Sequence, residues 1–283
     1  MSASRRFRTL LALGRISNLP TVWSNCLAAW WLGGGRLLPF SREFGFVLAG
    51  ASLLYTGGMF LNDAFDVEFD RQYRKERPIP SGAISLNSVW TCGAGAIAVG
   101  CALLFAAGSL AGLLGLLLAA FILAYNAVHK KWRFGPLLMA ACRVCLYLVA
   151  TAAAANRVRP LAALAALVMG FYIMGLSFVA RRESAGGPVR YCSLLALSAP
   201  WLLALFRMDP GYREKGLLLL LVPLLWTIKS LRYAFGKSNR NVGQAVCGLL
   251  AGIVLVDWLA VATAPREVSF VFIGLFLLAL GLQ

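Results

Sequence analysis

Long apolar stretches repeat along this chain, and each is about as long as a helix that crosses a membrane. The apolar core of a bilayer is roughly 30 Å thick and needs about 20 apolar residues in a helix. The chain is 60% hydrophobic and 13% charged, and its polar residues form only short segments between the apolar stretches. The sequence therefore predicts an all-α polytopic membrane bundle in which residues 1–283 form one domain.

Nine transmembrane helices are predicted, or ten if the short last stretch also crosses the membrane. Small residues such as Gly93 and Gly95 are frequent within the stretches, and they let membrane helices approach closely. The predicted spans are 17–35, 44–64, 86–107, 110–128, 136–155, 160–180, 190–206, 216–234, 242–262 and 268–282.

The basic residues predict how this bundle lies in the membrane. The chain has 27 Lys and Arg residues against 11 Asp and Glu residues, a net charge of +16. If residues 1–16 form a cytoplasmic tail, most basic residues fall in cytoplasmic segments, as the positive-inside rule requires. No basic stripe lies on a soluble domain, so we expect no nucleic-acid partner. We expect an integral, multi-pass protein whose N-terminus and active-site loops are cytoplasmic.

An acidic cluster follows the second predicted span. Asp63, Asp66, Glu68 and Asp70 are four of the 11 acidic residues. At about 100° per residue on a helix, Asp63, Asp66 and Asp70 share one face, Asn62 widens that face, and Glu68 points away. Carboxylates at the edge of a membrane helix are costly, which makes this stripe a functional-site hypothesis.

Three carboxylates and an amide form an all-oxygen surface of the kind that suits Mg²⁺. This ion binds through a few carboxylates and completes its shell with water and substrate phosphates. A helix end that is merely paired with Arg71 and Arg74 would explain one or two acids, but not a one-sided stripe of three. The predicted metal ligands in this cluster are Asn62, Asp63, Asp66 and Asp70.

A metal bridged to phosphates needs cations for the remaining negative charge, and several lie on the same predicted side of the membrane. Each of them alone is better explained as a solvated loop charge. Arg77 begins the segment Arg77-Pro78-Ile79-Pro80-Ser81-Gly82, in which two prolines and a glycine preclude a helix. The predicted diphosphate-binding residues are Asn62, Arg77, Lys131, Arg181 and Arg182, with Lys130 and Arg133 beside them.

These motifs resemble the UbiA superfamily of intramembrane prenyltransferases. The pattern Asn62-Asp63-x-x-Asp66-x-x-x-Asp70, followed by the Arg77–Gly82 segment, is similar to the first aspartate-rich motif of that superfamily. The segment Arg15–Thr21, with Asn25 beyond it, resembles its first helix. The resemblance covers the first two thirds of the chain and implies a nine-helix bundle.

The resemblance also implies an activity. Members transfer a prenyl group from an isoprenoid diphosphate to a small, usually aromatic, acceptor within the lipid bilayer, and they use Mg²⁺. Their Tyr-x-x-x-Lys element at the end of helix four corresponds here to Tyr125 and Lys130, with the lysine one place late. The catalytic residues that the resemblance implies are Asp63, Asp66, Asp70, Tyr125 and Lys130.

The chain departs from the superfamily at the second aspartate-rich motif, near the end of helix six. The corresponding stretch, 177–183, contains Glu183 as its only acid. Either Glu183 alone serves a second metal position, or Arg181 and Arg182 replace metal charge with fixed protein charge. Together with Cys142-Arg143 in helix five, this pattern is similar to the EboC-like branch of the superfamily.

Single charges and aromatic residues inside the spans have either a functional or a structural interpretation. Arg143 and Asp257 are charges within predicted spans, and each either orients an acceptor or belongs to a structural pair. Aromatic residues in spans are usually packing, but they also suit the walls of a pocket for an allylic cation. The candidates for such walls are Phe121, Tyr125, Tyr147, Phe171 and Tyr172.

Other classes of membrane protein fit less well. A CDP-alcohol phosphotransferase needs Asp-Gly-x-x-Ala-Arg after its second aspartate, whereas Val67 follows Asp66 here. An ion-coupled transporter would carry acids at mid-bilayer, where we expect only Asp257. The alternative that stays open is a catalytically degenerate family member that binds or translocates an isoprenoid or a small-molecule precursor.

Overall fold

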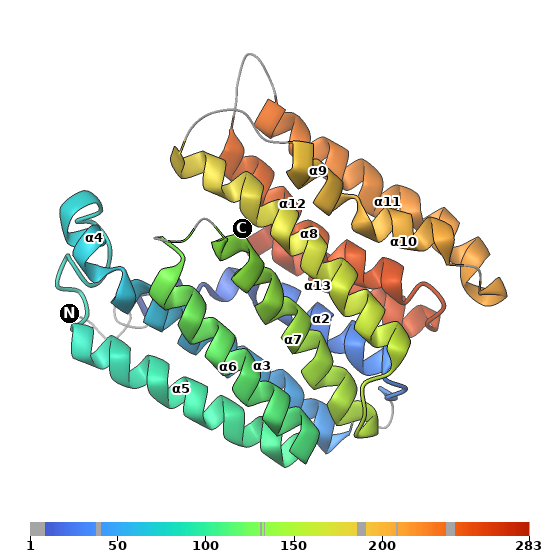
Figure 1. Cartoon of the computed structure of the whole chain (residues 1–283), viewed down its shortest axis with the longest axis horizontal. Helices are drawn as coiled ribbons and strands as arrows, with labels where there is room; N and C mark the ends of the chain where they lie inside the picture. The colour runs from blue at the N-terminus through green and yellow to red at the C-terminus, as the bar shows by residue number, and fades with distance from the viewer. Residues whose placement is uncertain are drawn as a thin grey trace.

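The computed structural model describes residues 9–37, 41–130, 132, 134–185, 191–207, 209–235 and 241–282, although side chains 182–185, 191, 192 and 210 are not described. All regular elements in these ranges are helical (Figure 1), which confirms the all-α prediction. The elements are η1 Ile16–Asn18, α2 Leu19–Leu32, α3 Arg42–Phe65, α4 Val67–Tyr73, α5 Leu86–Ala107, α6 Ser109–Val128, α7 Gly135–Ala155, α8 Pro160–Ala185, α9 Tyr191–Leu197, α10 Ala199–Phe206, α11 Pro210–Phe235, α12 Val242–Ala260 and α13 Arg266–Leu282.

Seven of the described helices are long and apolar enough to cross a membrane, namely α3, α5, α6, α7, α8, α11 and α12. The other three predicted spans form shorter helices. Helix α2 has 14 residues and α13 has 17. The stretch predicted as one span at 190–206 is two helices, because α9 ends at Leu197 and Pro200 in the first turn of α10 interrupts the helical hydrogen bonds.

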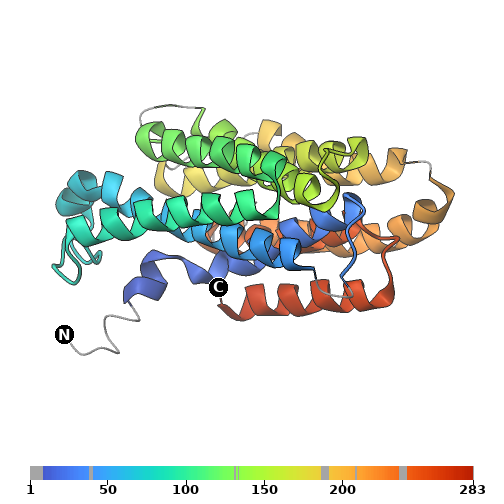
Figure 2. The ribbon, with the colours of Figure 1, turned by 90° about the horizontal axis from the view of Figure 1, so that it is seen from below.

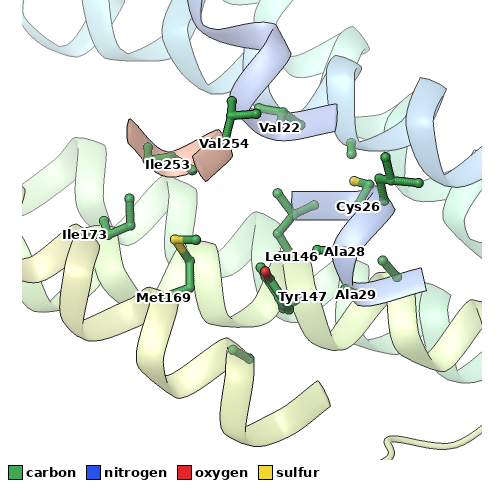
Figure 3. Close-up of a cluster of buried hydrophobic side chains, with 14 of the residues drawn as sticks. Val22, Cys26, Ala28, Ala29, Leu146, Tyr147, Met169, Ile173, Ile253 and Val254 are labelled. Carbon is green, nitrogen blue, oxygen red and sulfur yellow. The ribbon is translucent and has the colours of Figure 1, made fainter. Parts of the chain in front are cut away.

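Helix α2 lies at the centre of the bundle. It packs against α3, α7, α12 and α13, and most of its residues are buried. In Figure 3, Val22 and Cys26 of α2 meet Leu146 of α7 and Val254 of α12 in one apolar cluster. Figure 2 shows α13 along one edge of the bundle, where it covers α2 and α12. Helix α2 is therefore held in place by helices from both halves of the chain.

Helices α3 and α5 pack closely against each other, because glycines line their contact. A Cβ atom at Gly57 would lie 2.8 Å from the carbonyl oxygen of Gly93, and one at Gly100 would lie 3.0 Å from that of Gly50. Gly95, on the exposed face of α5, would meet no atom within 4 Å. Close backbone approach through small residues is the common packing mode of membrane helices, and it sets the position of the end of α3.

We predict that Gly57→Ala lowers the thermal stability of the purified protein, whereas Gly95→Ala does not. The new methyl group at position 57 forces α3 away from α5, and overpacking of this kind costs about 1–3 kcal/mol. At position 95 the methyl group enters open space, and alanine has the better helix propensity. Thermal unfolding of both variants in the same detergent measures the difference. Equal midpoints for the two variants would show that the contact is not tight.

Candidate functional site

Asp63 lies in the last turn of α3, where it is buried and faces two basic side chains. Arg77 Nη1 is 3.3 Å from Asp63 Oδ1 and 3.4 Å from Oδ2. Arg15 Nη2 is 3.6 Å from Asp63 Oδ1. The first pair ties the segment after α4 to the end of α3, and the second ties the residues before α2 to the same point.

Arg15 adopts a left-handed backbone conformation, with φ of 44° and ψ of 49°. This conformation is uncommon for a non-glycine residue and persists where the surroundings determine it. Here the hydroxyl of Tyr55 donates to the Arg15 carbonyl oxygen at 3.4 Å, and Arg15 Nη2 donates to Asn62 Oδ1 at 3.3 Å. Arg15 is predicted from the sequence only as part of the first-helix resemblance and not as a site residue, since no sequence pattern shows that it reaches Asp63.

Asp66 lies at a break between two helices. Because α3 ends at Phe65 and α4 begins at Val67, the prediction of one helix through 62–70 is wrong at this residue. The Asp70 N–H nevertheless donates to the Asp66 carbonyl oxygen at 2.9 Å, so the chain keeps a helical course. Glu68, which was predicted to point away from the stripe, is exposed.

Two residues after α6 face the Asp66 carboxylate. Lys130 Nζ is 2.8 Å from Asp66 Oδ1, and His129 Nε2 is 3.7 Å from Oδ2. The Lys130 ammonium also lies 4.0 Å from the ring centre of Phe69 on α4. The lysine that the sequence places one position late in its motif is therefore in direct contact with the acidic stripe.

Asp70 is buried, and its Oδ1 atom has no hydrogen-bond partner. Few other buried side-chain atoms in the described ranges are in this situation. A buried carboxylate oxygen without a donor is unfavourable, and oxygen of this type is a ligand that Mg²⁺ accepts. The chemistry of this atom thus fits a divalent cation.

The three carboxylates do not surround one point. In the part of the chain that the structure describes, no three Asp, Glu, His or Cys side chains are grouped as ligands of a metal ion. Asp63 and Asp66 turn toward basic side chains instead. The metal-binding role of the stripe therefore stays a prediction, and it requires these ion pairs to open.

Asn62 joins α3 to α6. Its Nδ2 donates to Asn126 Oδ1 at 3.2 Å, and Asn126 Nδ2 donates to the Gly58 carbonyl oxygen at 3.0 Å. Since Asn62 Oδ1 also accepts from Arg15, both ends of this amide are engaged within the protein. Asn126 is a further residue of the site that the sequence analysis did not name.

The remaining predicted site residues divide into three groups. Tyr125 stacks on His129, with ring centres 4.8 Å apart. Arg181 at the end of α8 donates to the carbonyl oxygens of His129 and Trp132 at 2.7 and 2.8 Å, so it holds the α6–α7 connection. Lys131 and Arg133 lie outside the described residues, as do the side chains of Arg182 and Glu183.

A cavity of about 80 Å³ lies beside this network, between α2, α3, α6 and α7. Tyr55, Tyr125, Asn126 and Arg143 contribute its polar lining, and Asn126 links it to Asn62. A separate groove of about 320 Å³ runs between α6, α7 and α8, and apolar side chains line it. Of the aromatic residues considered as pocket walls, Tyr125 lines the cavity, Phe121 and Phe171 line the groove, and Tyr147 and Tyr172 are buried in the core.

The helical bundle, with acidic and basic side chains paired at one end, is typical of one class of membrane proteins, the intramembrane prenyltransferases. Residues 19–234, well over half of the chain, match the UbiA prenyltransferase family. The chain belongs to that family.

Individual relatives match over shorter regions. The digeranylgeranylglyceryl phosphate synthase of Ignicoccus hospitalis is 32% identical over 131 residues, which cover 46% of this chain and 42% of that protein. The corresponding synthase of Metallosphaera sedula is 39% identical over 80 residues, 28% of each chain. Both matches cover less than half of the relative's length.

Solved structures show the same fold. An apo UbiA homologue from Aeropyrum pernix has a TM-score of 0.67 and 19% identity, and the alignment covers 83% of this chain and 94% of that one. A UbiA homologue from Archaeoglobus fulgidus, solved with GPP and Mg²⁺, has a TM-score of 0.53 and 14% identity over 97% of this chain and 99% of that one. At these identities the likeness concerns the fold alone.

We predict that Arg77→Met loosens the segment 74–85. The Arg77–Asp63 pair is the charged contact between this segment and α3, beside the apolar packing of Ile79, and the methionine keeps the length of the side chain without its charge. Amide hydrogen exchange in the segment should become several-fold faster, as expected for the loss of about 1 kcal/mol. Lys75→Met, which removes an exposed charge from the same segment, is the matched control. Equal exchange rates in both variants would contradict the anchoring role.

Proposed function

We propose that this protein transfers a prenyl group from an isoprenoid diphosphate to a small acceptor within the membrane, in a Mg²⁺-dependent reaction. One observation carries the proposal. The acidic stripe at the end of α3 is surrounded by Arg15, Arg77 and Lys130, and the buried Asp70 Oδ1 has no donor. Neighbouring acidic and basic groups of this kind suit a metal bound to a diphosphate, because the carboxylates can bind the cation and the basic groups can bind the phosphates. The membership in the UbiA family supports the same assignment.

Asp63, Asp66 and Asp70, with Asn62, would hold the Mg²⁺. When bound, the ion supplies positive charge to the phosphate oxygens of the donor. Asp70 would hold the ion without giving up a basic partner, because its Oδ1 atom has no hydrogen-bond partner within the protein. Asp63 and Asp66 would exchange their basic partners for the metal.

The released cations would then bind the diphosphate. Lys130, Arg77 and Arg15 take the negative charge that develops on the leaving group as the allylic C–O bond breaks. The electron pair of that bond goes to the diphosphate, and the nucleophilic atom of the acceptor forms the new bond and gives its proton to the released diphosphate or to water. The carboxylates would exchange their basic partners for the metal, and the basic residues would exchange the carboxylates for the diphosphate. No charge would then be left unpaired in a poorly hydrated region.

The other predicted residues have supporting roles. Tyr125 lines the cavity beside the stripe, where an aromatic face stabilises an allylic cation and water is scarce. Arg181 acts through the α6–α7 connection, which it holds by two backbone carbonyls. Lys131, Arg182 and Glu183 are kept as predicted contributors to the binding of diphosphate or metal. The positive-inside rule supports a cytoplasmic location for this end of the bundle and for the N-terminus.

A second candidate function is a non-catalytic one. The stretch 177–183 has a single acid, Glu183, so a second metal site of the type implied by the superfamily lacks most of its ligands. A family member of this kind would bind or translocate an isoprenoid without releasing pyrophosphate.

We predict that Asp66→Asn abolishes Mg²⁺-dependent release of pyrophosphate from geranylgeranyl diphosphate. The amide keeps the shape of the side chain but removes the charge that binds the metal and orients Lys130. We expect a loss of at least about 100-fold, equivalent to roughly 3 kcal/mol of transition-state stabilisation. Pyrophosphate is measured with purified protein, with Mg²⁺ and after its removal by EDTA.

Glu68→Gln is the matched control, because Glu68 belongs to the same acidic cluster but is exposed on the opposite face of α4. Its activity should stay close to that of the unmodified protein. Full activity of Asp66→Asn would refute the site assignment. Binding of the donor without any turnover by the unmodified protein would instead favour the non-catalytic function.

A further inference from the structure

Two charged residues lie inside the bundle, away from the acidic stripe, and both are fastened to the central helix. Asp257 of α12 accepts hydrogen bonds from Ser24 Oγ and Asn25 Nδ2 of α2 at 2.6 and 2.7 Å. Arg143 of α7 donates to Asn25 Oδ1 at 2.7 Å and to Thr21 Oγ1 at 3.0 Å. These contacts support the structural interpretation of both charges.

A buried asparagine on α6 makes contacts of another kind, because it bonds to a predicted metal ligand. Asn126 Oδ1 accepts from Asn62 Nδ2 at 3.2 Å, and Asn126 Nδ2 donates to the Gly58 carbonyl oxygen at 3.0 Å. Gly58 and Asn62 lie four residues apart on α3, which is about one helical turn. A Cβ atom at Gly58 would lie 2.8 Å from Cγ2 of Ile122, so the glycine lets α6 come close enough for these bonds.

The Gly58 carbonyl determines how the two amides are oriented. A carbonyl oxygen can only accept a hydrogen bond, so the nitrogen of the Asn126 amide faces it and the Asn126 oxygen faces Asn62. That oxygen can also only accept, so Asn62 turns its nitrogen to Asn126 and its oxygen away from Asn126. Arg15, which can only donate, meets the Asn62 oxygen at 3.3 Å. Both ends of this series of bonds therefore require the same orientation.

This orientation is the one that a metal ligand needs, because an amide oxygen can bind a divalent cation whereas an amide NH₂ group is only a donor. In the proposed function, Arg15 leaves Asn62 for the diphosphate. One of the two constraints on the Asn62 amide is then lost. The bond to Asn126 remains, since neither Asn126 nor Gly58 is paired with a charged group of the stripe.

We propose that Asn126 is a positioning residue that keeps the oxygen of Asn62 directed to the metal, and that the Gly58 carbonyl in turn fixes Asn126. The inference rests on the proposed function, since it concerns metal binding at the same site. Groups behind a metal ligand commonly orient it in this way, and their loss typically weakens metal binding about 10- to 100-fold. Without Asn126, the Asn62 amide can turn over and present its nitrogen, which does not bind the ion.

Binding of Mn²⁺ to four forms of the full-length protein tests this inference without any need for turnover. The forms are the unmodified protein, Asn126→Leu, Asn62→Asp and the variant with both substitutions. Leucine has a similar size to asparagine but no polar group. Aspartate at position 62 carries an oxygen at both ends, so its orientation does not matter. Each form is prepared in nanodiscs of zwitterionic lipid, and the EPR signal of free Mn²⁺ gives the Kd.

We expect Asn126→Leu to raise the Kd about tenfold or more when residue 62 is asparagine, and less than about twofold in the Asn62→Asp background. A merely structural Asn126 would raise the Kd by the same factor in both backgrounds, because a loosened contact between α3 and α6 affects either side chain. Ser52→Ala is the matched control, since it removes the acceptor of the Trp23 Nε1 hydrogen bond to α3 away from the stripe. It should leave the Kd within about twofold.

An unchanged Kd in Asn126→Leu, or an equal loss in both backgrounds, would overturn the inference. In either case Mn²⁺ binding by the unmodified protein would still support the proposed function. No Mn²⁺ binding by the unmodified protein would count against the proposed function and would overturn the inference with it. If Asn126→Leu does not fold, Asn126→Ser takes its place, because a serine hydroxyl can bond to a carbonyl of its own helix.

Discussion

A carboxylate at the end of a membrane-spanning helix must be paired with positive charge, and this requirement organises one end of the bundle. Asp63 is paired with Arg77 and Arg15, and Asp66 is paired with Lys130. These partners come from the segment before α2, the segment after α4 and the end of α6. The ion pairs thus bring three distant parts of the chain to one place, and the same charges suit a diphosphate and its metal.

The central helix α2 connects this end of the bundle with the interior. Just before this helix, Arg15 reaches the acidic stripe, and within the helix Thr21 and Asn25 hold Arg143. Asn25 in turn donates a hydrogen bond to Asp257 on α12. One buried helix thus holds the acidic stripe and the network of Arg143 and Asp257 in a fixed relative position. The glycine contact between α3 and α5 holds α3, which carries Asp63, from the other side.

The sequence predicted features that depend on one segment, and it missed those that depend on contacts between segments. Helix α5 has the predicted bounds, and those of α6 and α12 differ by one or two residues, because their apolar stretches end at polar or glycine residues. The shared face of Asp63, Asp66 and Asp70, which helical geometry predicts, stays a prediction. The break at Asp66, the left-handed Arg15 and the partner of Arg181 did not follow from the sequence, since each is set by packing against another part of the chain.

The central claim is that the acidic stripe exchanges its basic partners for a metal and a diphosphate. A crystal structure with Mn²⁺ and an unreactive thiolodiphosphate analogue of the donor tests it most directly, because anomalous scattering locates the metal. We predict a manganese peak in contact with Asp70 and with Asp63 or Asp66, and Lys130 and Arg77 on phosphate oxygens. A bound analogue with the metal elsewhere, and with the Asp63–Arg77 and Asp66–Lys130 pairs intact, would contradict the claim.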